Sequence, residues 1–400
     1  MKYALILPDG CADEPVPQLD GRTPLQVARI PNMDSIVARG RIGRVRTVPK
    51  GLTPGSDVAT LSVIGYDPVA CYTGRAPLEA VAKRIRLGPD ELVFRCNLVT
   101  IIEGRMEDFS AGHISQPEAE KLLADLQAKM GDDRIQFHTG VGYRHLVTIK
   151  DADWMKVKCT PPHDIPGKEA AGYLPTGKGS ELLRELIERS QKVLANHEVN
   201  QVRQDLGESL ATSIWLWGHG AMPKLASFKK RFGIQGAAIT AVDLIRGLAL
   251  SVGWKLIEVP GATGYYDTNY AGKGEAAAKA LDRVDLVAVH IEAPDEAGHN
   301  GDPLNKIKAL ERIDEHIVGP VLEKLQTFDA WRVLCLPDHP TPVTLRTHTS
   351  DPVPFGMCGT GIVPDEAKEF TERASAESDL YVDPGHELME YFLKSRLEGK

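Results

Sequence analysis

The chain has 400 residues, which is more than one hydrophobic core usually holds, so two domains are expected. Hydrophobic residues make up 42% of the chain, charged residues make up 26%, and the formal net charge is −8. These values are typical of a globular protein and argue against one that wraps nucleic acid or binds an anionic membrane.

The sequence lacks the signals of export and of zinc-finger or redox motifs. No stretch approaches the roughly 20 apolar residues of a membrane span, and the first apolar run is too short for a signal peptide. The six cysteines are scattered and form no C-x-x-C pair. We therefore expect a cytoplasmic protein with reduced cysteines, which binds a small anionic substrate and neither nucleic acid nor membrane.

The first predicted element is a strand over residues 2–7, which ends at Pro8-Asp9-Gly10. An aspartate before glycine is common in turns, so Asp9 alone is a weak signal. Thr23 and Pro24 predict the start of a short helix, and residues 31–39 predict a second one.

A turn-rich loop over residues 51–57 opens the apolar run 58–64 and carries Ser56. A hydroxyl at such a junction is most often a helix N-cap. The alternative is a nucleophile at a helix N-terminus, where the helix favours a phosphate; a serine then needs a base or a metal to activate it. The loop by itself favours the cap.

From residue 93 to 214 the pattern changes to a smaller α+β insert. Strands are predicted at 94–102 and 143–149, with a helix at 117–130 between them. A linker rich in Pro and Gly over 160–179 precedes a helix at 180–196. Singly, the polar residues of this region are ordinary surface or core residues. As a group they would form a receptor for a small anion: His113, Arg144, His145, His163, Lys168 and Arg203. Arg75, just before the insert, is a further candidate for binding phosphate.

Residues 172–179 match the pattern G-x-x-x-x-G-K of a nucleotide-binding loop only in part. Gly179 stands where a Ser or Thr should hold Mg²⁺, and no buried strand precedes the loop. We interpret this segment as linker.

After residue 215 strands and helices alternate again. A helix is predicted at 237–249, a strand at 254–259 and a helix at 274–281. Two buried strands follow, at 284–291 and 331–336, joined by a helical crossover over 304–325. The fold class is therefore α/β: a mostly parallel sheet covered by helices on both faces forms a discontinuous core (1–92 and 215–400), with a smaller domain (93–214) inserted.

Carboxylates and imidazoles follow the last two buried strands: Asp295, His299, Asp338, His339 and His348. Open α/β sheets bind ligands at the carboxyl ends of their strands. Carboxylate and imidazole together suit Mn²⁺, Zn²⁺, Co²⁺ or Fe²⁺, with Mg²⁺ also possible. Turn residues and helix caps are the alternative for each residue alone, but five in two such places favour a metal site.

Six motifs in this order resemble the archaeal-type cofactor-independent phosphoglycerate mutases, members of the alkaline phosphatase superfamily. They are Pro8-Asp9-Gly10, Pro54-Gly55-Ser56-Asp57, Gly65-Tyr66-Asp67-Pro68, Tyr72-Thr73-Gly74-Arg75, Asp295-Glu296-Ala297-Gly298-His299, and Asp338-His339 through His348-Thr349. The resemblance implies an alkaline-phosphatase-like core and two divalent metals, one held by Asp9, Ser56, Asp338 and His339, the other by Asp295, His299 and His348. It also implies that Ser56 is the nucleophile that carries phosphate between 3-phosphoglycerate and 2-phosphoglycerate.

The insert departs from that family. Residues 110–115 read Ser-Ala-Gly-His-Ile-Ser where an Arg is expected. Together with residues 159–164 (Cys-Thr-Pro-Pro-His-Asp) and 336–340 (Leu-Pro-Asp-His-Pro), this segment is similar to a bacterial subset proposed to be homoserine kinases. The alternatives are therefore a homoserine kinase, a metal-dependent hydrolase and a non-catalytic binding protein. The missing nucleotide motif counts against the first, the large insert against the second, and the complete ligand set against the third.

Overall fold

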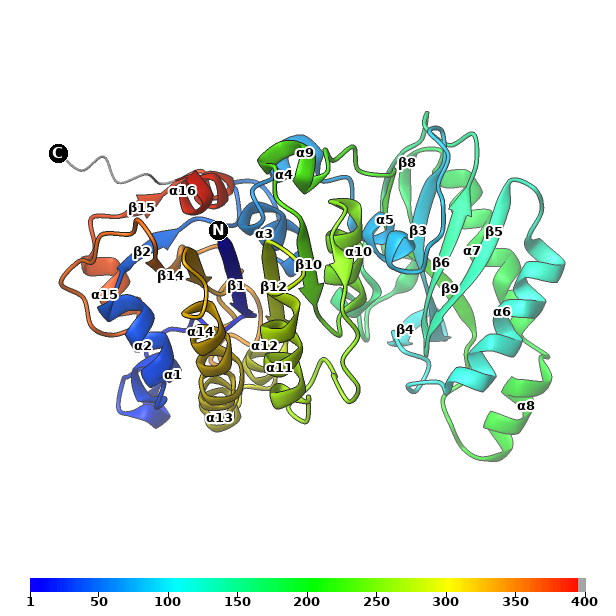
Figure 1. Cartoon of the computed structure of the whole chain (residues 1–400). Coiled ribbons are helices and arrows are strands. Elements are labelled where there is room, and N and C mark those ends of the chain that lie inside the picture. The colour runs from blue at the N-terminus through cyan, green and yellow to red at the C-terminus, as the bar shows by residue number, and fades with distance from the viewer. Residues whose placement is uncertain (395–400) are drawn as a thin grey trace. The chain divides into compact units, whose positions relative to one another are not determined.

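The structure is a computed structural model that describes residues 1–394, and the chain divides into two compact units. Unit 1 contains Met1–Tyr72 together with Lys224–Lys400, and unit 2 contains Thr73–Pro223 (Figure 1). Compared with the predicted insert, unit 2 also takes residues 73–92 and 215–223. The reason is that α5 (Arg75–Ala82) packs on β3 (Leu92–Ile102) and that β9 (Ser213–Gly220) pairs with β3.

Unit 1 is built on an eight-stranded sheet with the order β11-β10-β12-β1-β13-β14-β2-β15. The pairs are parallel except at β14, which is antiparallel to both of its neighbours. The mostly parallel α/β fold predicted from the sequence is thus confirmed. The strands are β1 (Lys2–Pro8), β2 (Arg41–Val45), β10 (Gly236–Ile239), β11 (Lys255–Leu256), β12 (Leu286–Ile291), β13 (Trp331–Cys335), β14 (Val353–Gly359) and β15 (Tyr381–Val382).

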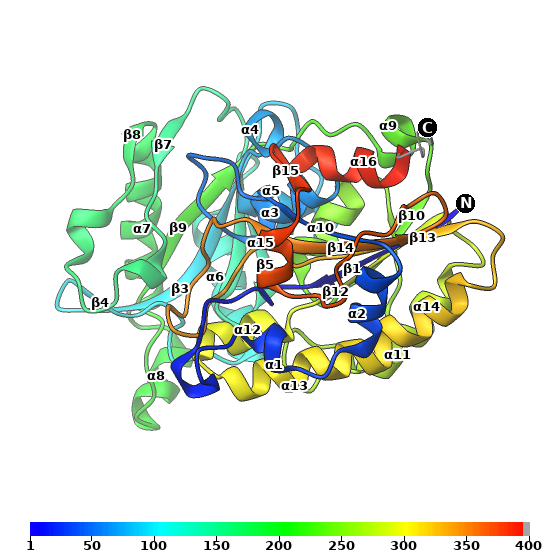
Figure 2. The same ribbon diagram turned by 90° about the vertical axis from the view of Figure 1, so that its left-hand side faces the viewer.

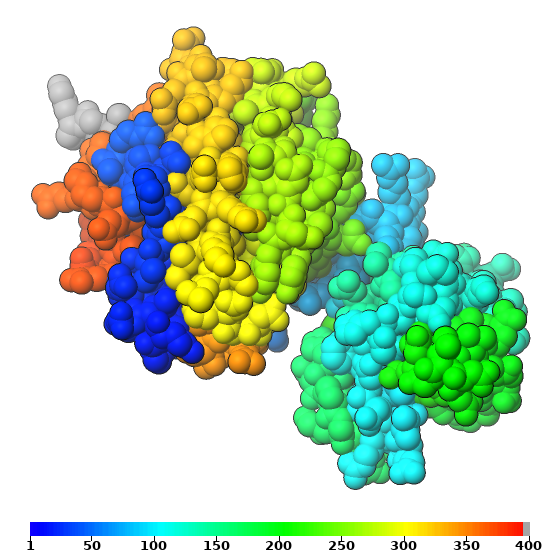
Figure 3. Space-filling model, turned by 90° about the horizontal axis from the view of Figure 1, so that it is seen from below, coloured from blue at the N-terminus to red at the C-terminus, as the bar shows by residue number. Residues whose placement is uncertain are grey.

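Helices cover both faces of this sheet (Figure 2). One layer contains α2 (Pro31–Ala38), α11 (Tyr270–Ala280), α13 (Pro303–Ile313) and α14 (Gly319–Leu325), with a π-helical turn at Asp314–Val318. Figure 3 shows α11, α13 and α14 of this layer side by side, in yellow-green to gold. The other face carries α3 (Ser56–Val63), α10 (Asp243–Ser251) and α16 (Leu388–Lys394). Shorter helices complete the unit: α1 (Pro24–Val27), α4 (Pro68–Cys71), α9 (Phe228–Phe232), α12 (Ala293–Asn300) and α15 (Glu372–Glu377).

The central strands are buried because they are apolar along their whole length. Every residue of β12 is buried, and only Lys2 of β1 is partly exposed. Such continuous apolar runs are typical of parallel strands covered on both faces. Ile6 lies opposite Val289 on one side and Cys335 on the other, so the three strands end at the same edge of the sheet.

Unit 2 is an α+β unit, as the sequence predicts. Its five-stranded sheet is antiparallel, and α6 and α7 pack against β5 and β9. The remaining elements are β4 (Arg105–Asp108), α6 (Gln116–Met130), β5 (Ile135–Val141), β6 (Arg144–Ile149), β7 (Lys156–Lys158), β8 (Thr176–Lys178), α7 (Ser180–Leu194) and α8 (Glu198–Asp205).

One predicted element is wrong. The run 237–249 does not form one helix: its first residues belong to strand β10, which pairs with β12, and a turn separates them from α10. The run is apolar throughout, so periodicity could not separate a buried strand from a buried helix. The strand predicted at 254–259 is also shorter, because only Lys255 and Leu256 pair with β10.

Two findings bear on the expected chemistry of the chain. All six cysteines lie within the described residues and are free. None of the helices formed by residues 1–394 combines the length and the hydrophobicity that crossing a membrane requires.

Candidate active site

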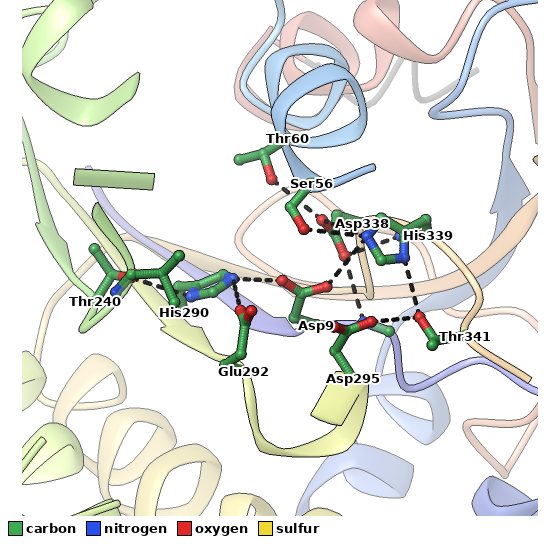
Figure 4. A network of polar contacts seen from close by, with 12 residues as sticks. Asp9, Ser56, Thr60, Thr240, His290, Glu292, Asp295, Asp338, His339 and Thr341 are labelled. Atoms are coloured by element: carbon green, nitrogen blue, oxygen red, sulfur yellow. Dashed lines mark hydrogen bonds and ion pairs between the residues drawn. The ribbon is translucent and has the colours of Figure 1, made fainter. Parts of the chain in front are cut away.

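The polar cluster of unit 1 lies where three parallel strands end (Figure 4). Asp9 follows β1, Asp295 lies in α12 after β12, and Asp338 follows β13. The strand register brings these three ends together, and the Asp9 amide donates to the carbonyl of Ile291 at 3.0 Å. The convergence of three carboxylates, predicted from their places after buried strands, is therefore a property of the folded sheet.

Asp9, Asp338 and His339 form the first group of candidate metal ligands, and all three are fully buried. The Nε2 atom of His339 lies 3.5 Å from Asp9 Oδ1 and 3.5 Å from Asp338 Oδ2. Asp9 Oδ1 has no hydrogen-bond partner among the described residues. A buried carboxylate oxygen without a partner is costly, and a cation at this point would satisfy it.

Ser56 lies beside this group. Its Oγ atom is 3.2 Å from His339 Nε2, and the residue is 7% exposed. The N-cap of α3 is Gly55, so Ser56 is the first residue of the helix and not its cap. Its hydroxyl is directed at the carboxylate–imidazole group.

Asp295, His299 and His348 form the second group. Asp295 and His299 are four residues apart on α12 and therefore lie on one face of that helix. The Nε2 atoms of His299 and His348 are 2.9 Å apart, and Asp295 Oδ2 is 3.2 Å from the first of them. His299 Nδ1 lies 3.1 Å from the carbonyl of Arg346, which leaves Nε2 to bind a metal.

Burial and the surrounding charges shift the acidities of these groups in opposite directions. Burial, together with the charges of Asp338 and Glu292, raises the pKa of Asp9 well above its usual value. Burial also opposes ionisation of Asp295, but hydrogen bonds from His299 and His348 outweigh it and hold the pKa of Asp295 well below its usual value. The hydrogen bond between Asp295 and His299 raises the pKa of His299 to about 9. Such crowding of carboxylates favours cation binding.

The site also contains residues that the sequence argument did not assign. His290 Nε2 lies 2.8 Å from Asp9 Oδ2 and its Nδ1 lies 3.1 Å from Thr240 Oγ1. Glu292 Oε2 is 3.5 Å from the same imidazole, and Thr60 Oγ1 donates to Asp338 at 3.3 Å. His290 lies inside a buried strand and has the pattern of a core residue, so only its position five residues before Asp295 could have indicated a role.

Arg203 and His145, two residues proposed from the sequence to bind the substrate, are used inside unit 2. The guanidinium of Arg203 donates to the carbonyls of Ser209 and Ala111 and pairs with Glu118 at 2.9 Å. His145 is 2% exposed, and its Nδ1 accepts the amide hydrogen of Gly140. These contacts favour structural roles for both residues.

The other substrate-binding candidates gather on one part of unit 2. Ring contacts link His163, Phe109, Tyr143 and His113 in series, with centroids about 6 Å apart, and the guanidinium of Arg144 lies over the Tyr143 ring at 5.4 Å. Burial and the charges of Arg95 and Arg75 lower the pKa of His163.

The segment 172–179 forms no phosphate-binding loop. Thr176–Lys178 is strand β8, paired antiparallel with β7, and Lys178 Nζ lies over the Trp154 ring.

Fold and site together define an α/β protein with a buried serine beside a cluster of candidate metal ligands, at the carboxyl edge of a mostly parallel sheet; Asp9, His290 and Glu292 form a third, overlapping group in this cluster. Residues 38–200 match the family model described as 2,3-bisphosphoglycerate-independent phosphoglycerate mutase. The chain is 51% identical to the protein of that name from Methanothrix thermoacetophila over 390 residues, which cover 97% of this chain and 98% of the relative.

Two solved structures resemble the whole chain. The PH0037 protein of Pyrococcus horikoshii aligns with a TM-score of 0.83 at 28% identity and covers 98% of this chain and 96% of its own. The cofactor-independent phosphoglycerate mutase of Thermoplasma acidophilum aligns with a TM-score of 0.67 at 26% identity and covers 98% and 99%. The chain belongs to the family of 2,3-bisphosphoglycerate-independent phosphoglycerate mutases, as its motifs predict.

Proposed function

We propose that the protein interconverts 3-phosphoglycerate and 2-phosphoglycerate through a phosphoserine at Ser56, with two divalent cations bound beside it. The observation that carries this proposal is the position of the Ser56 hydroxyl, 3.2 Å from His339 Nε2, which itself lies within 3.5 Å of Asp9 and Asp338. The relatives named above support the reaction.

The donor atoms fit two cations. Asp9, Ser56, Asp338 and His339 would hold one, and Asp295, His299 and His348 would hold the other. Mn²⁺, Mg²⁺, Zn²⁺ and Co²⁺ all accept these carboxylate and imidazole ligands. When bound, the two ions lower the pKa of the serine hydroxyl and stabilise the negative charge on the attacking and leaving oxygens.

In the first half of the reaction, Ser56 Oγ attacks phosphorus and loses its proton, while the bond from phosphorus to O3 breaks and O3 gains a proton. In the second half the 2-hydroxyl of the bound glycerate attacks phosphorus and loses its proton, while the bond from phosphorus to Ser56 Oγ breaks and Oγ gains a proton. Ser56 begins α3, so the N-terminal end of the helix dipole favours the phosphate it carries.

The acceptor must stay bound between the two steps. We assign the glycerate carboxylate and hydroxyls to the arginines and histidines of unit 2, namely Arg75, His113, Arg144 and His163. Arginine binds a carboxylate through two parallel hydrogen bonds, which both holds and orients it. Exclusion of water during this interval protects the phosphoserine from hydrolysis.

One assay tests the reaction. Purified protein is incubated with Mn²⁺ and either 3-phosphoglycerate or homoserine with ATP, the metal is then chelated, and the products are identified by ³¹P NMR. We expect 2-phosphoglycerate from the first mixture and no phosphohomoserine from the second. Turnover of the second mixture alone would show a homoserine kinase, and release of inorganic phosphate alone would show a hydrolase.

A matched pair of serine variants tests the covalent step. Ser56→Ala should lower kcat by at least about 10⁴-fold, because no other residue replaces the nucleophile. Ser62→Ala, on the same helix and also buried, should keep wild-type activity, because its hydroxyl has no hydrogen-bond partner among the described residues. Mass spectrometry of acid-quenched wild-type protein should find phosphate on Ser56, and mutase activity in the alanine variant would rule this route out.

A further inference from the structure

The two candidate ligand groups meet at one hydroxyl. Thr341 is fully buried, and its Oγ1 lies 2.5 Å from Asp295 Oδ1 and 3.3 Å from His339 Nδ1 (Figure 4). Asp295 belongs to one group and His339 to the other. Among the described residues, Thr341 is therefore in contact with a ligand of each group.

The direction of these hydrogen bonds follows from the donors available. An ionised carboxylate only accepts, so the single hydroxyl proton of Thr341 is donated to Asp295 Oδ1. The hydroxyl oxygen is then left to accept, and His339 Nδ1 must carry the proton that it accepts. A neutral His339 consequently has its lone pair on Nε2, the atom that faces Ser56, Asp9 and Asp338.

The backbone of Thr341 is also fixed by hydrogen bonds. Its carbonyl accepts a hydrogen bond from Lys306 Nζ at 2.8 Å, and its amide donates to the carbonyl of Ala12 at 3.3 Å. Lys306 is fully buried and also pairs with Asp13 at 2.7 Å. The loops that follow β1 and β13 are thus tied to α13 through one ammonium group.

Glycines on two sides keep the space around Thr341 small. A Cβ atom at Gly10 would lie 2.6 Å from Thr341 Oγ1 and 2.5 Å from Asp295 Oδ1, and one at Gly298 would lie 2.2 Å from the Thr341 carbonyl oxygen. Gly10 also has a φ of +60°. The turn after β1 and helix α12 can approach the threonine this closely only because these positions carry no side chain.

We propose that Thr341 is a positioning residue that couples the two metal-binding groups, because one hydroxyl orients a ligand of each. The inference rests on the proposed function in so far as both groups bind a divalent cation. It predicts that loss of this hydroxyl weakens both sites together. Loss of a hydroxyl that contacts a ligand of only one group should weaken metal binding at that group and leave binding at the other unchanged.

The chain provides the matched variants for this comparison. Thr341→Val removes the hydroxyl and keeps the shape, whereas Thr341→Ser restores the hydroxyl. Thr60→Val removes a hydroxyl that, among the described residues, hydrogen-bonds to Asp338 and to no ligand of the other group. Thr344→Val is a control on the same loop, because Thr344 is exposed.

Mn²⁺ binding to metal-free protein is measured by the loss of the EPR signal of the free ion, with no substrate present. We expect two ions per wild-type chain, roughly tenfold to 100-fold weaker binding of both in Thr341→Val, and recovery to within about threefold in Thr341→Ser. Thr60→Val should weaken the binding of one ion only, and Thr344→Val should leave the binding of both ions unchanged.

The outcomes separate the two proposals. A wild-type chain that binds no Mn²⁺ would contradict the proposed function. The coupling role would be overturned if the wild type binds two ions and Thr341→Val binds both as tightly. It would also be overturned if Thr341→Val weakens the binding of only one of them. Should Thr341→Val fail to fold by circular dichroism, Thr341→Ala takes its place, and the serine variant must still bind both ions as the wild type does.

Discussion

At the scale of single residues, two arginines of unit 2 show how surroundings decide a role. Arg203 is 2% exposed, and its guanidinium donates to two carbonyls and pairs with Glu118 and Glu208. Arg144 is exposed and its guanidinium lies over the Tyr143 ring. Both were substrate-binding candidates in the sequence, but only Arg144 has an exposed side chain.

Substitution should separate the two roles. Arg203→Met should lower the free energy of unfolding by about 3 kcal/mol, because removing one partner of a largely buried ion pair leaves carboxylates and carbonyls without their donor. Its KM for 3-phosphoglycerate should stay within about twofold. Arg144→Ala should raise KM at least tenfold, because a carboxylate–guanidinium hydrogen bond is worth roughly 1.5–3 kcal/mol.

Urea unfolding and steady-state kinetics on the same preparations check this pair of expectations. Arg144→Lys serves as the charge-preserving control and should recover part of the affinity, because lysine lacks the planar fork. A raised KM in the Arg203 variant with normal stability would reverse the assignment.

At the scale of elements, β5 and β6 form a hairpin whose register shifts between His138 and Val141. The Gly140 amide, within this irregular stretch, donates to Nδ1 of His145 on β6 at 2.9 Å. The His145 imidazole thus accepts the hydrogen bond that a backbone carbonyl would accept in a regular hairpin. Burial, with a smaller contribution from the charge of Lys83, lowers the pKa of His145 to about 3.

This hairpin should make the stability of unit 2 sensitive to acid. The imidazole stays neutral in the folded chain, while the unfolded chain takes up a proton below its usual pKa of about 6.5. The contribution is therefore fully present above pH 6.5 and is lost as the pH falls from 6.5 towards 3. At pH 5 the loss should be about 2 kcal/mol, which is 1.36 kcal/mol for each of about 1.5 pH units.

The measurement is urea unfolding at pH 7.5 and pH 5, followed by the fluorescence of Trp215 and Trp217. His145→Asn keeps an acceptor for the Gly140 amide but cannot titrate, so its stability should fall less between the two pH values. His113→Gln, at an exposed position of the same unit, should behave like the wild type. Equal losses in all three proteins would show that other groups cause the acid sensitivity.

At the scale of the whole molecule, every proposed metal ligand lies in unit 1, although the chain of that unit is interrupted by the whole of unit 2. The ligands come from the segments after β1, β12 and β13 and from the start of α3. Cation binding should therefore stabilise unit 1 and leave the internal stability of unit 2 unchanged, because a ligand stabilises only the state that binds it.

Hydrogen exchange with and without Mn²⁺ tests this separation. At a free concentration of 100 times the dissociation constant, one bound ion stabilises by about 2.7 kcal/mol, so amides that exchange only after the ion leaves should slow by roughly 100-fold. We expect this in α12 and in residues 9–13 and 338–343. Strands β3 and β9 should exchange at the same rate in both conditions, and slowing confined to residues 73–223 would contradict the assignment.

The sequence alone was sufficient for the parts of the protein that depend on local pattern. The apolar runs that form β1, β12 and β13 are continuous and end in charged residues, so both the parallel sheet and the polar cluster at its edge could be predicted. Thr23 and Pro24 marked the start of α1, where the threonine forms a capping box with Gln26. The order of the six motifs indicated the family, which the relatives confirm.

Other features depend on contacts between residues far apart in the chain, and only the tertiary structure decided them. The run 237–249 became a strand and then a helix because β10 pairs with β12. Arg203 became a structural residue because Glu118, 85 positions away, lies beside it. Thr341 has no distinguishing pattern in the sequence; it touches Asp295 and His339 because the loops after β12 and β13 meet at one edge of the sheet, and such a meeting is set by strand order, not by local composition.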